Sequence, residues 1–350
     1  MSVPRWFLWL VAGAILLSGL VAGRAYLVPI AIALVLFSLL AALIDRIRRL
    51  RLGDLSVPRP LATIIGLVII AWALFLMVSV MSSQVEAVIA ASPRYVARME
   101  TLLSQAAEFF GRDIAEDLQK ALSEINLTAR IPGLVGSAGA TVTTITLIVL
   151  YMGFMFVERG AFRTKLERLF PDPDHSERVH SVILSISDSV QRYFSIKLFV
   201  SALTGLAAYV VMKPMGLDFA ETWALLAVLL NFIPNIGSAV ATILPAIVAL
   251  VQFDTLGPFL IIAMGVGSIQ LIIGNFVEPA LMGRSLNLSP LVIILSLTFW
   301  AFVWGFVGMF LSVPIMVIVL IVCSHIPAWR PVAILLSRDG RIPDSEQAGQ

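Results

Sequence analysis

The 350-residue sequence has few charged residues, few histidines and a single cysteine. Charged side chains form 13% of the chain, against about 25% in soluble domains, which excludes an ordinary soluble globule. The lone Cys323 excludes a disulfide framework and a multi-cysteine metal site. The net charge of +2 is too small to indicate a nucleic-acid partner. The spacing of the histidines is not that of metal ligands, so no metal site is predicted.

Signatures of catalysis are also missing from the sequence. No GxxxxGK[ST] motif occurs, so ATP hydrolysis by this chain is not expected. The serines of the apolar segments have no histidine partner within those segments, which argues against a membrane hydrolase. The sequence therefore predicts a protein that is not an enzyme and needs no cofactor.

Apolar segments dominate instead, because 59% of the residues are hydrophobic. A membrane-crossing helix needs about 20 apolar residues, and two of the apolar runs are longer than that and interrupted. We predict an all-α polytopic membrane protein with about six spanning helices plus two re-entrant helical hairpins, or about eight spans, and a small helical extramembrane region. The uninterrupted candidates are Trp6–Ala22, Ala25–Ile44, Leu61–Met81, Leu134–Val157, Leu198–Met212 and Phe259–Val277, and the interrupted runs are Trp223–Val251 and Leu291–Cys323.

Lys and Arg positions predict the orientation of these segments. The loop Asp45–Pro60 holds five arginines against two aspartates, which places it in the cytoplasm. Ser82–Pro132 holds seven acids against five basic residues, and its apolar residues have helical spacing. Asp174–Phe194 carries one apolar face and is predicted to be an interfacial helix that runs into the next span. Both termini then lie in the cytoplasm.

The predicted organisation follows from this topology. The parts are three transmembrane helices in 1–81 with the cytoplasmic arginine-rich loop 45–60, an extracytoplasmic helical region in 82–132, a fourth transmembrane helix in 133–157, a cytoplasmic amphipathic helix region in 158–197, a transport core with two broken hairpins in 198–323, and a cytoplasmic tail in 324–350.

The two interrupted runs contain helix-breaking residues where broken backbone is costly. The first holds NFIPNIGS at Asn231–Ser238, and the second breaks at Gly305 and Gly308. Non-helical backbone at membrane depth is tolerated only beside protein or a water-filled cavity, which favours re-entrant hairpins. A proline-kinked helix or a plain loop between short spans is the alternative. The predicted topology gives the two runs opposite orientations, a pattern typical of inverted-repeat secondary transporters.

Polar residues also lie in the apolar segment between the two runs. Gly267, Gln270, Gly274 and Glu278 are spaced 3, 4 and 4, which predicts one helix face with two glycines for close packing. Asn275 lies beside this face, and Pro279 is predicted to end the helix just beyond Glu278. Glu278 is either a snorkelling interface residue or a buried functional group.

The same residues carry a family resemblance. NFIPNIGS, IQLIIGNFVEPALMGRSLNLSPLVIILSLTFW, WGFVGMFLSVPIM and PAWRPVAILLS resemble segments of the autoinducer-2 exporter family of bacterial inner-membrane proteins. The resemblance implies a multi-pass homo-oligomer, with a pentamer as one candidate form. Members are described either as exporters of autoinducer-2 or as sodium/proton antiporters. Where the family commonly has an aromatic residue after the first proline, this sequence has Asn235.

We therefore predict a secondary transporter that exports a small polar signal molecule such as autoinducer-2 or a similar solute. Amide side chains would supply its hydrogen-bond donors and acceptors. A sodium or other monovalent cation/proton antiporter is the alternative, with Glu278 as its ion-binding carboxylate, and a passive pore is a third reading. The expected partners are membrane lipid and either the solute or a monovalent cation and a proton. The predicted pathway residues are Asn231, Pro234, Asn235, Gly237, Gln270, Asn275, Glu278, Gly305 and Gly308.

Overall fold

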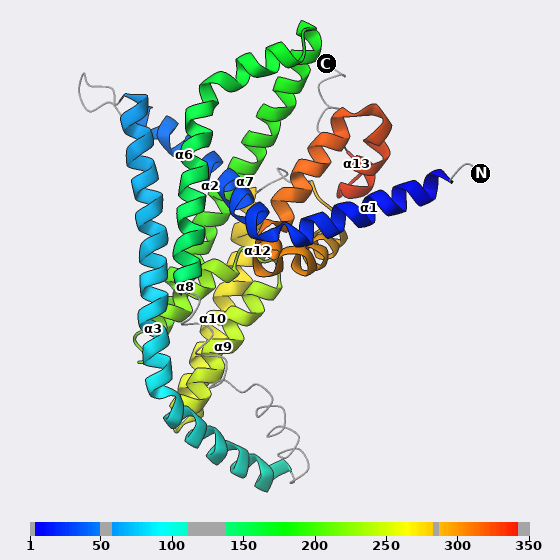
Figure 1. The fold of residues 1–350 in the computed structure, drawn as a ribbon. Helices are drawn as coiled ribbons and strands as arrows, with labels where there is room; N and C mark the ends of the chain where they lie inside the picture. Colours follow the sequence, from blue (N-terminus) through cyan, green and yellow to red (C-terminus); the bar gives the residue numbers. More distant parts are fainter. Residues whose placement is uncertain (1–3, 50–57, 111–137, 283–286, 342–350) are drawn as a thin grey trace. The chain divides into compact units, whose positions relative to one another are not determined.

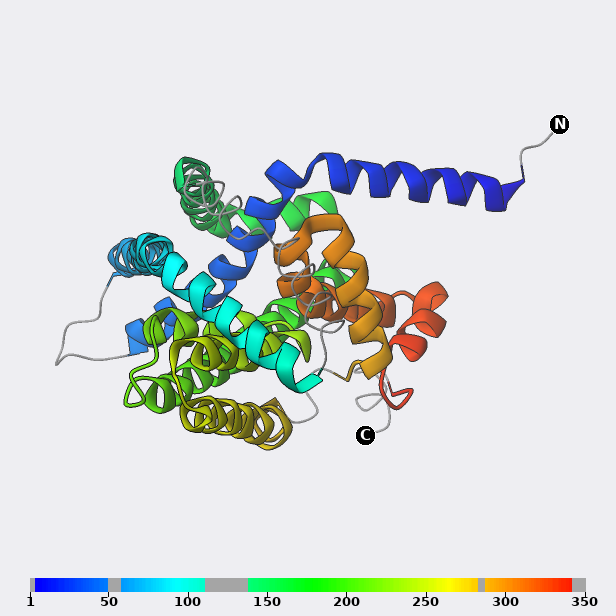
Figure 2. The same cartoon turned by 90° about the horizontal axis from the view of Figure 1, so that it is seen from below.

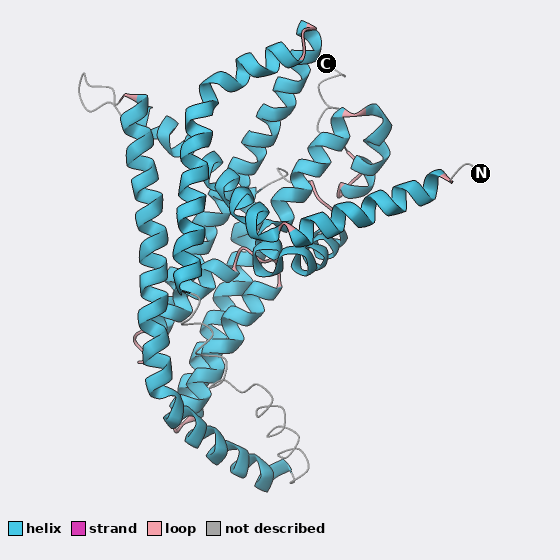
Figure 3. Cartoon of the chain, viewed as in Figure 1, coloured by secondary structure: helices cyan, strands magenta, loops and turns pink. Residues whose placement is uncertain are grey.

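The computed structural model describes residues 4–49, 58–110, 138–282 and 287–341. Within these residues the secondary structure is helical and contains no strand (Figure 3); a single isolated bridge joins Leu288 to Ser337. Five of the described helices are long and apolar enough to cross a membrane, and shorter apolar helices accompany them. The predicted class, an all-α polytopic membrane protein, is confirmed.

Figure 1 shows the helices in chain order. They are α1 (Arg5–Ala22), α2 (Arg24–Arg49), α3 (Arg59–Phe110), α6 (Ala138–Leu169), α7 (Pro173–Met212), α8 (Ala220–Leu230), α9 (Ile236–Gln252), α10 (Leu256–Ile272), the π-helical turn η1 (Ile273–Val277), α11 (Glu278–Met282), α12 (Pro290–His325), the 3-10 turn η2 (Pro327–Trp329) and α13 (Arg330–Leu336).

The two longest helices, α3 and α7, far exceed the roughly 20 residues of a single membrane span. α3 has 52 residues and continues from the apolar segment through Pro93 to Phe110 without a break. α7 has 40 residues, so the amphipathic segment after Pro173 runs directly into the apolar segment that ends at Met212. Asp174–Phe194 is helical, as predicted, and of the helical region predicted in Ser82–Pro132 the described part, up to Phe110, is helical as well. Parts of the predicted arginine-rich loop (50–57), extracytoplasmic region (111–132) and C-terminal tail (342–350) lie outside the described residues.

The chain divides into two compact units. Among the described residues, unit 1 comprises 4–49, 58–70, 144–196, 281–282 and 287–341. One of its cores joins α2, α3 and α6 around Leu40, Ala62 and Met152, which are fully buried. In the same unit, the indole N–H of Trp304 in α12 donates to the carbonyl of Leu20 in α1, at 3.1 Å.

Among the described residues, unit 2 comprises 71–110, 138–143 and 197–280. Its core is formed where the second half of α7 meets α8, α9 and α10, with Met212, Ala249, Ile262 and Val266 almost completely buried. Figure 1 shows α8, α9 and α10 side by side. Small residues allow this approach: a Cβ atom on Gly265 would lie 2.9 Å from the Val211 side chain, so α7 and α10 are in close contact.

Both interrupted runs fold back on themselves, which fits both a re-entrant hairpin and two short spans joined by a loop. In unit 2 the first run forms α8, a five-residue turn and α9 (hairpin 1). In unit 1 the second run forms α12, which reverses at Gly305 (hairpin 2; Figure 2). The Ser296 hydroxyl donates to the carbonyl of Ser312 at 3.2 Å, whereas a straight helix would separate these residues by about 24 Å. The depth of both tips in the membrane stays a prediction.

Candidate functional site

The tip of hairpin 1 is built around a strained turn. The N–H of Ile236 donates to the carbonyl of Pro234 at 2.7 Å, which closes a three-residue γ-turn centred on Asn235. Asn235 has φ 61° and ψ −51°, close to the rare and strained form of this turn. Gly237 follows, and a Cβ atom there would lie 1.7 Å from the carbonyl oxygen of Leu230. The turn therefore requires glycine at 237 and strains the backbone at 235.

Asn231 begins this turn and has a buried side chain. Its amide Nδ2 donates to the hydroxyl oxygen of Ser201 in α7 at 3.0 Å. Thr204, one turn further along the same face of α7, is fully buried, and its hydroxyl donates to the carbonyl of Val200. Hairpin 1 is thus joined to α7 by a hydrogen bond between buried polar groups.

Lys197 extends this buried polar face of α7 by one more turn. Lys197, Ser201 and Thr204 are spaced 4 and 3, so their side chains share one face of the helix. The Lys197 ammonium contacts the carboxylate Oε1 of Glu278 at 2.5 Å, and the two side chains are 4% and 21% exposed. A buried ammonium loses its hydration, so this ion pair is what makes the position of Lys197 tolerable.

Glu278 reaches Lys197 because the helix before it is not regular. In η1 the N–H of Glu278 donates to the carbonyl of Ile273, five residues back, which inserts one extra residue into the turn. An unbroken α-helix would place Gln270 and Glu278 about 80° apart around the axis, and the extra residue reduces this to about 20°. The π-turn therefore directs Glu278 to the side that Gln270 occupies.

This turn corrects two expectations. Gly274 is exposed, with no described neighbour within 4 Å of a built Cβ atom, so it gives no close packing within this chain; the buried stripe runs through Val266, Gln270 and Ile273 instead. The helix also does not end at Pro279, because α11 continues to Met282. The π-turn has already rearranged the hydrogen bonds at the position where proline lacks a donor.

Asn275 lies inside the π-turn and is exposed. Its amide Nδ2 donates to the carbonyl of Leu271 at 3.0 Å, four residues back. In a regular helix that carbonyl would accept from the backbone N–H of residue 275. The side chain of Asn275 thus supports the irregular turn that positions Glu278.

Gln270 is the buried polar group of α10. Its residue is 8% exposed, and its amide Nε2 has no hydrogen-bond partner among the described residues. A buried donor without a partner costs about 1–3 kcal/mol of stability. The cost is explained if a bound molecule completes the hydrogen bond. We call Lys197, Ser201, Thr204, Asn231, Gln270 and Glu278 the polar stripe of unit 2.

The predicted site residues are thus only partly brought together. Asn231 and Glu278 both contact one face of α7, through Ser201 and Lys197, and Pro234, Asn235 and Gly237 form the turn beside Asn231, whereas Gln270 is buried on α10. Gly305 and Gly308 lie in unit 1. Gly305 has φ 63° and ψ −139°, and a Cβ atom on Gly308 would lie 1.9 Å from the carbonyl oxygen of Trp300. These two glycines serve the reversal of hairpin 2.

The sequence interpretation missed Lys197, Ser201 and Thr204. Their signal was present, because a lysine and two hydroxyl residues recur at helical spacing at the start of the apolar segment Leu198–Met212. A lysine beside the end of a predicted span is usually read as a snorkelling residue, whose charge reaches the membrane surface. Only the fold places this one inward.

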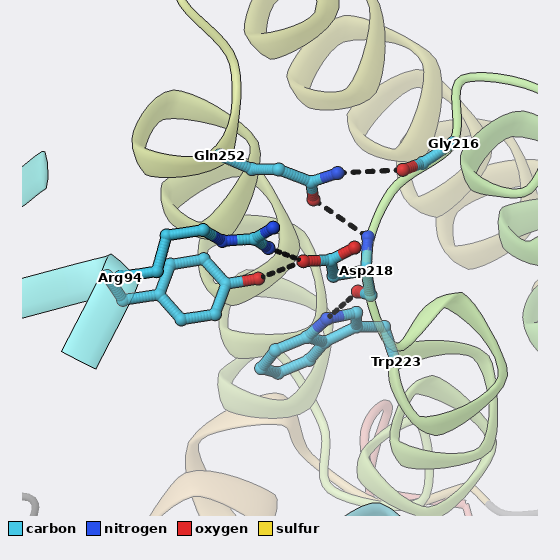
Figure 4. Close-up of polar contacts among 6 residues, drawn as sticks. Arg94, Gly216, Asp218, Trp223 and Gln252 are labelled. Atoms are coloured by element: carbon cyan, nitrogen blue, oxygen red, sulfur yellow. Dashed lines mark hydrogen bonds and ion pairs between the residues drawn. The ribbon is translucent and has the colours of Figure 1, made fainter. Parts of the chain in front are cut away.

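A second polar cluster lies elsewhere in unit 2 (Figure 4). The carboxylate of Asp218 accepts from the Arg94 guanidinium and, at 2.8 Å, from the hydroxyl of Tyr95, both in α3. The Asp218 N–H donates to Oε1 of Gln252, and the indole of Trp223 donates to the Asp218 carbonyl. Partial burial, followed by the hydrogen bond to Asp218, raises the pKa of Tyr95 to about 12. The cluster joins α3 to the α7–α8 loop and to the end of α9.

Comparison with known proteins places the chain among transporters. The sequence profile described as AI-2E family transporter matches residues 6–328. The AI-2 transport protein TqsA of Escherichia coli (strain K12) is 32% identical over 327 residues, which cover 92% of each chain. A Haemophilus influenzae protein named for transport is 29% identical over 349 residues, covering 96% of this chain and 97% of its own. The chain is therefore a member of the AI-2E family of membrane transporters.

Proposed function

We propose that this transporter is a secondary transporter that exports a small polar solute such as autoinducer-2. The observation that carries the proposal is the buried amide of Gln270, whose Nε2 has no hydrogen-bond partner among the described residues. Together with Asn231, Ser201 and Thr204 it supplies donors and acceptors suited to a molecule rich in hydroxyl groups. The printed name of TqsA assigns AI-2 transport to that relative and supports the choice of solute.

Uptake into vesicles tests this proposal. The purified protein is reconstituted into liposomes, and entry of radiolabelled autoinducer-2 is measured with and without an imposed pH gradient. A secondary transporter should accumulate the solute above its outside concentration when the gradient is present. Equilibration that does not respond to the gradient would contradict coupled transport and favour a passive pore.

Substitution of Gln270 sharpens the test. Gln270→Leu keeps the volume and removes the donor, so it should reduce solute uptake at least about tenfold while leaving the folded protein as stable as before. Gln191→Leu is the matched control, because Gln191 lies on α7 outside the polar stripe. Wild-type uptake by the Gln270→Leu protein would remove Gln270 from the solute pathway.

A monovalent cation/proton antiporter is the second candidate. The ion pair between Lys197 and Glu278 favours it, because antiport needs a carboxylate that exchanges a proton for a cation. Liposomes with an internal pH-sensitive dye distinguish the candidates. Added sodium should release protons from the lumen if the protein is an antiporter, and Glu278→Gln should abolish that release.

We also propose that the protein is a homo-oligomer in the bacterial inner membrane, with both termini and the 45–60 loop in the cytoplasm and residues 82–132 outside. The arginine excess of the loop supports this orientation. A reporter that is active only in the cytoplasm should stay silent when fused near Gly111.

Cysteines near Asn235 and Gly308, in a Cys323→Ser background, should react with an impermeant thiol reagent far more slowly than cysteines in ordinary loops if both tips lie within the membrane.

A further inference from the structure

A cavity of about 330 Å³ lies in unit 1, where the end of α6 turns into the start of α7. Its volume is at the lower end of the range of small-molecule sites. Leu166 in α6 and Phe170 just after it form apolar walls, and Ser176, Glu177 and His180 of α7 line it with polar groups. We propose that this cavity, the corner cavity, binds a small primary amine, which is an ammonium group on a short apolar body.

Two polar side chains of the corner cavity lack hydrogen-bond partners among the described residues. Ser176 is 9% exposed, and its hydroxyl makes no hydrogen bond there. The buried Nδ1 of His180, four residues further along the same face of α7, has no partner either. Buried polar groups are normally hydrogen-bonded. A hydroxyl oxygen and a neutral imidazole nitrogen can each accept a hydrogen bond, so both can receive the N–H groups of one ligand.

The charge of the lining favours a cation. Arg163 and Glu167 neutralise each other through a contact of 3.0 Å between Nε and Oε1. Glu177 makes no ion pair among the described residues, so the lining keeps one negative charge when His180 is neutral. A primary ammonium carries one positive charge and three N–H donors. These donors match the Glu177 carboxylate, the Ser176 hydroxyl oxygen and the Nδ1 of His180 in number.

An anion is the kind of ligand that the start of a helix attracts, but the start of α7 already has partners within the chain. Asp172 accepts from the N–H of Asp174 through its carboxylate at 3.3 Å, and from the N–H of Ser176 through its carbonyl at 3.0 Å. The carboxylates of Asp172 and Asp174 would also repel an anion. Phe170 adds an aromatic ring to the wall, and aromatic faces attract ammonium groups. The corner cavity is therefore suited to an organic cation.

Ligands of one size and different charge test the proposal on the purified, detergent-solubilised protein. n-Butylammonium should raise the melting temperature in a saturable way, whereas 1-butanol and butyrate at equal concentration and ionic strength should produce no saturable rise. Tetramethylammonium carries the charge without N–H groups, so its apparent affinity should be at least about tenfold weaker. The absence of a saturable rise with n-butylammonium, or an equal rise with butyrate, would overturn the proposal.

Substitutions assign the response to the corner cavity. Glu177→Gln and Ser176→Ala should each weaken the apparent affinity for n-butylammonium at least about tenfold. Glu158→Gln and Ser181→Ala are the matched controls and should respond as the wild type, because both residues are exposed on the same two helices and do not line the cavity. Glu177 is exposed, so its substitution should leave folding intact. A wild-type response of the Glu177→Gln protein would overturn the proposal, because the amine would then bind elsewhere. Binding is measured without transport, so the result does not depend on the proposed solute.

Discussion

Hairpin 1 and hairpin 2 reverse the chain by the same device but carry different side chains. In each, a glycine lies against the carbonyl of the preceding helix: Gly237 against Leu230, and Gly308 against Trp300. Hairpin 1 needs five residues for its turn and places the buried amide of Asn231 there. Hairpin 2 turns at Gly305 and is flanked by the rings of Trp300 and Trp304, whose centroids are 4.8 Å apart and whose planes are tilted by 48°.

Comparing the two hairpins shows which side chains a chain reversal needs and which it does not. Hairpin 2 reverses with an aromatic pair and a hydroxyl-to-carbonyl bond, so a buried carboxamide is not needed to turn the chain. Asn231 in hairpin 1 is therefore not explained by the turn alone. Its contact with Ser201, on the face of α7 that carries Lys197, connects hairpin 1 to the polar stripe. We infer that hairpin 1 supplies a polar group for the function of the protein, whereas hairpin 2 serves to reverse the chain.

The largest expected effect is a loss of folding stability, and it is the same for substitutions in either hairpin. Gly237→Ala and Gly308→Ala would each drive a methyl group into a backbone carbonyl at less than 2 Å, with built distances of 1.7 and 1.9 Å. Backbone cannot yield as a side chain does, so we expect a loss of more than about 4 kcal/mol and little folded protein. The yield of monodisperse protein after purification measures this. Gly274→Ala is the control and should behave as the wild type, because its Cβ position is open among the described residues.

A smaller effect is specific to unit 2. Glu278→Gln leaves the Lys197 ammonium buried without its partner, and we expect a loss of about 2–4 kcal/mol in unfolding free energy. Lys197→Met combined with Glu278→Leu removes both charges and should recover most of that loss. Reversible unfolding of the wild type, Lys197→Met, Glu278→Leu and the double variant in detergent gives the coupling energy. Additive losses would mean that the two charges do not stabilise each other.

The next comparison sets Asn231 against Ser296, which are buried hydrogen-bonding residues of hairpin 1 and hairpin 2. Asn231→Leu and Ser296→Ala should each change stability by only about 1 kcal/mol. Solute uptake should fall at least about tenfold for Asn231→Leu, the factor that corresponds to about 1.4 kcal/mol of lost binding free energy. Uptake by Ser296→Ala should stay near that of the wild type. Equal losses of uptake would contradict the assignment of chemistry to hairpin 1.

The smallest expected effect concerns the Asp218 cluster and depends on pH. The pKa of Tyr95 is raised to about 12, so its neutral form stabilises the folded state fully below the ordinary value near 10. That stabilisation is lost as the pH rises from about 10 to about 12. Because Tyr95 is partly exposed, we expect a change of no more than about 1 kcal/mol. The stability gap between the wild type and Tyr95→Phe should narrow over this interval, and a constant gap would show that Tyr95 does not titrate there.

Much of the fold was predictable because it follows from local patterns. Long apolar runs give helices, and NFIPNIGS and the glycines at 305 and 308 mark where two of those helices reverse. The face of α10 was predicted less well. Regular helical spacing put Gly274 and Glu278 on one face, whereas the π-turn moved Glu278 by one residue and left Gly274 exposed. A π-turn has no reliable sequence signature, because neighbouring packing decides which helical hydrogen bonds form.

The sequence by itself determined the helical membrane class, the positions of the two breaks and the family. These depend on hydrophobicity, on proline and glycine geometry, and on motifs that are contiguous in the chain. Only the tertiary structure decided that Lys197 meets Glu278, 81 residues away, and that Ser201 meets Asn231. Such pairings depend on the register between α7 and its neighbours, one contact of which is the close approach of Val211 to Gly265. That register is a property of packed surfaces, so it can be read only once the helices are assembled.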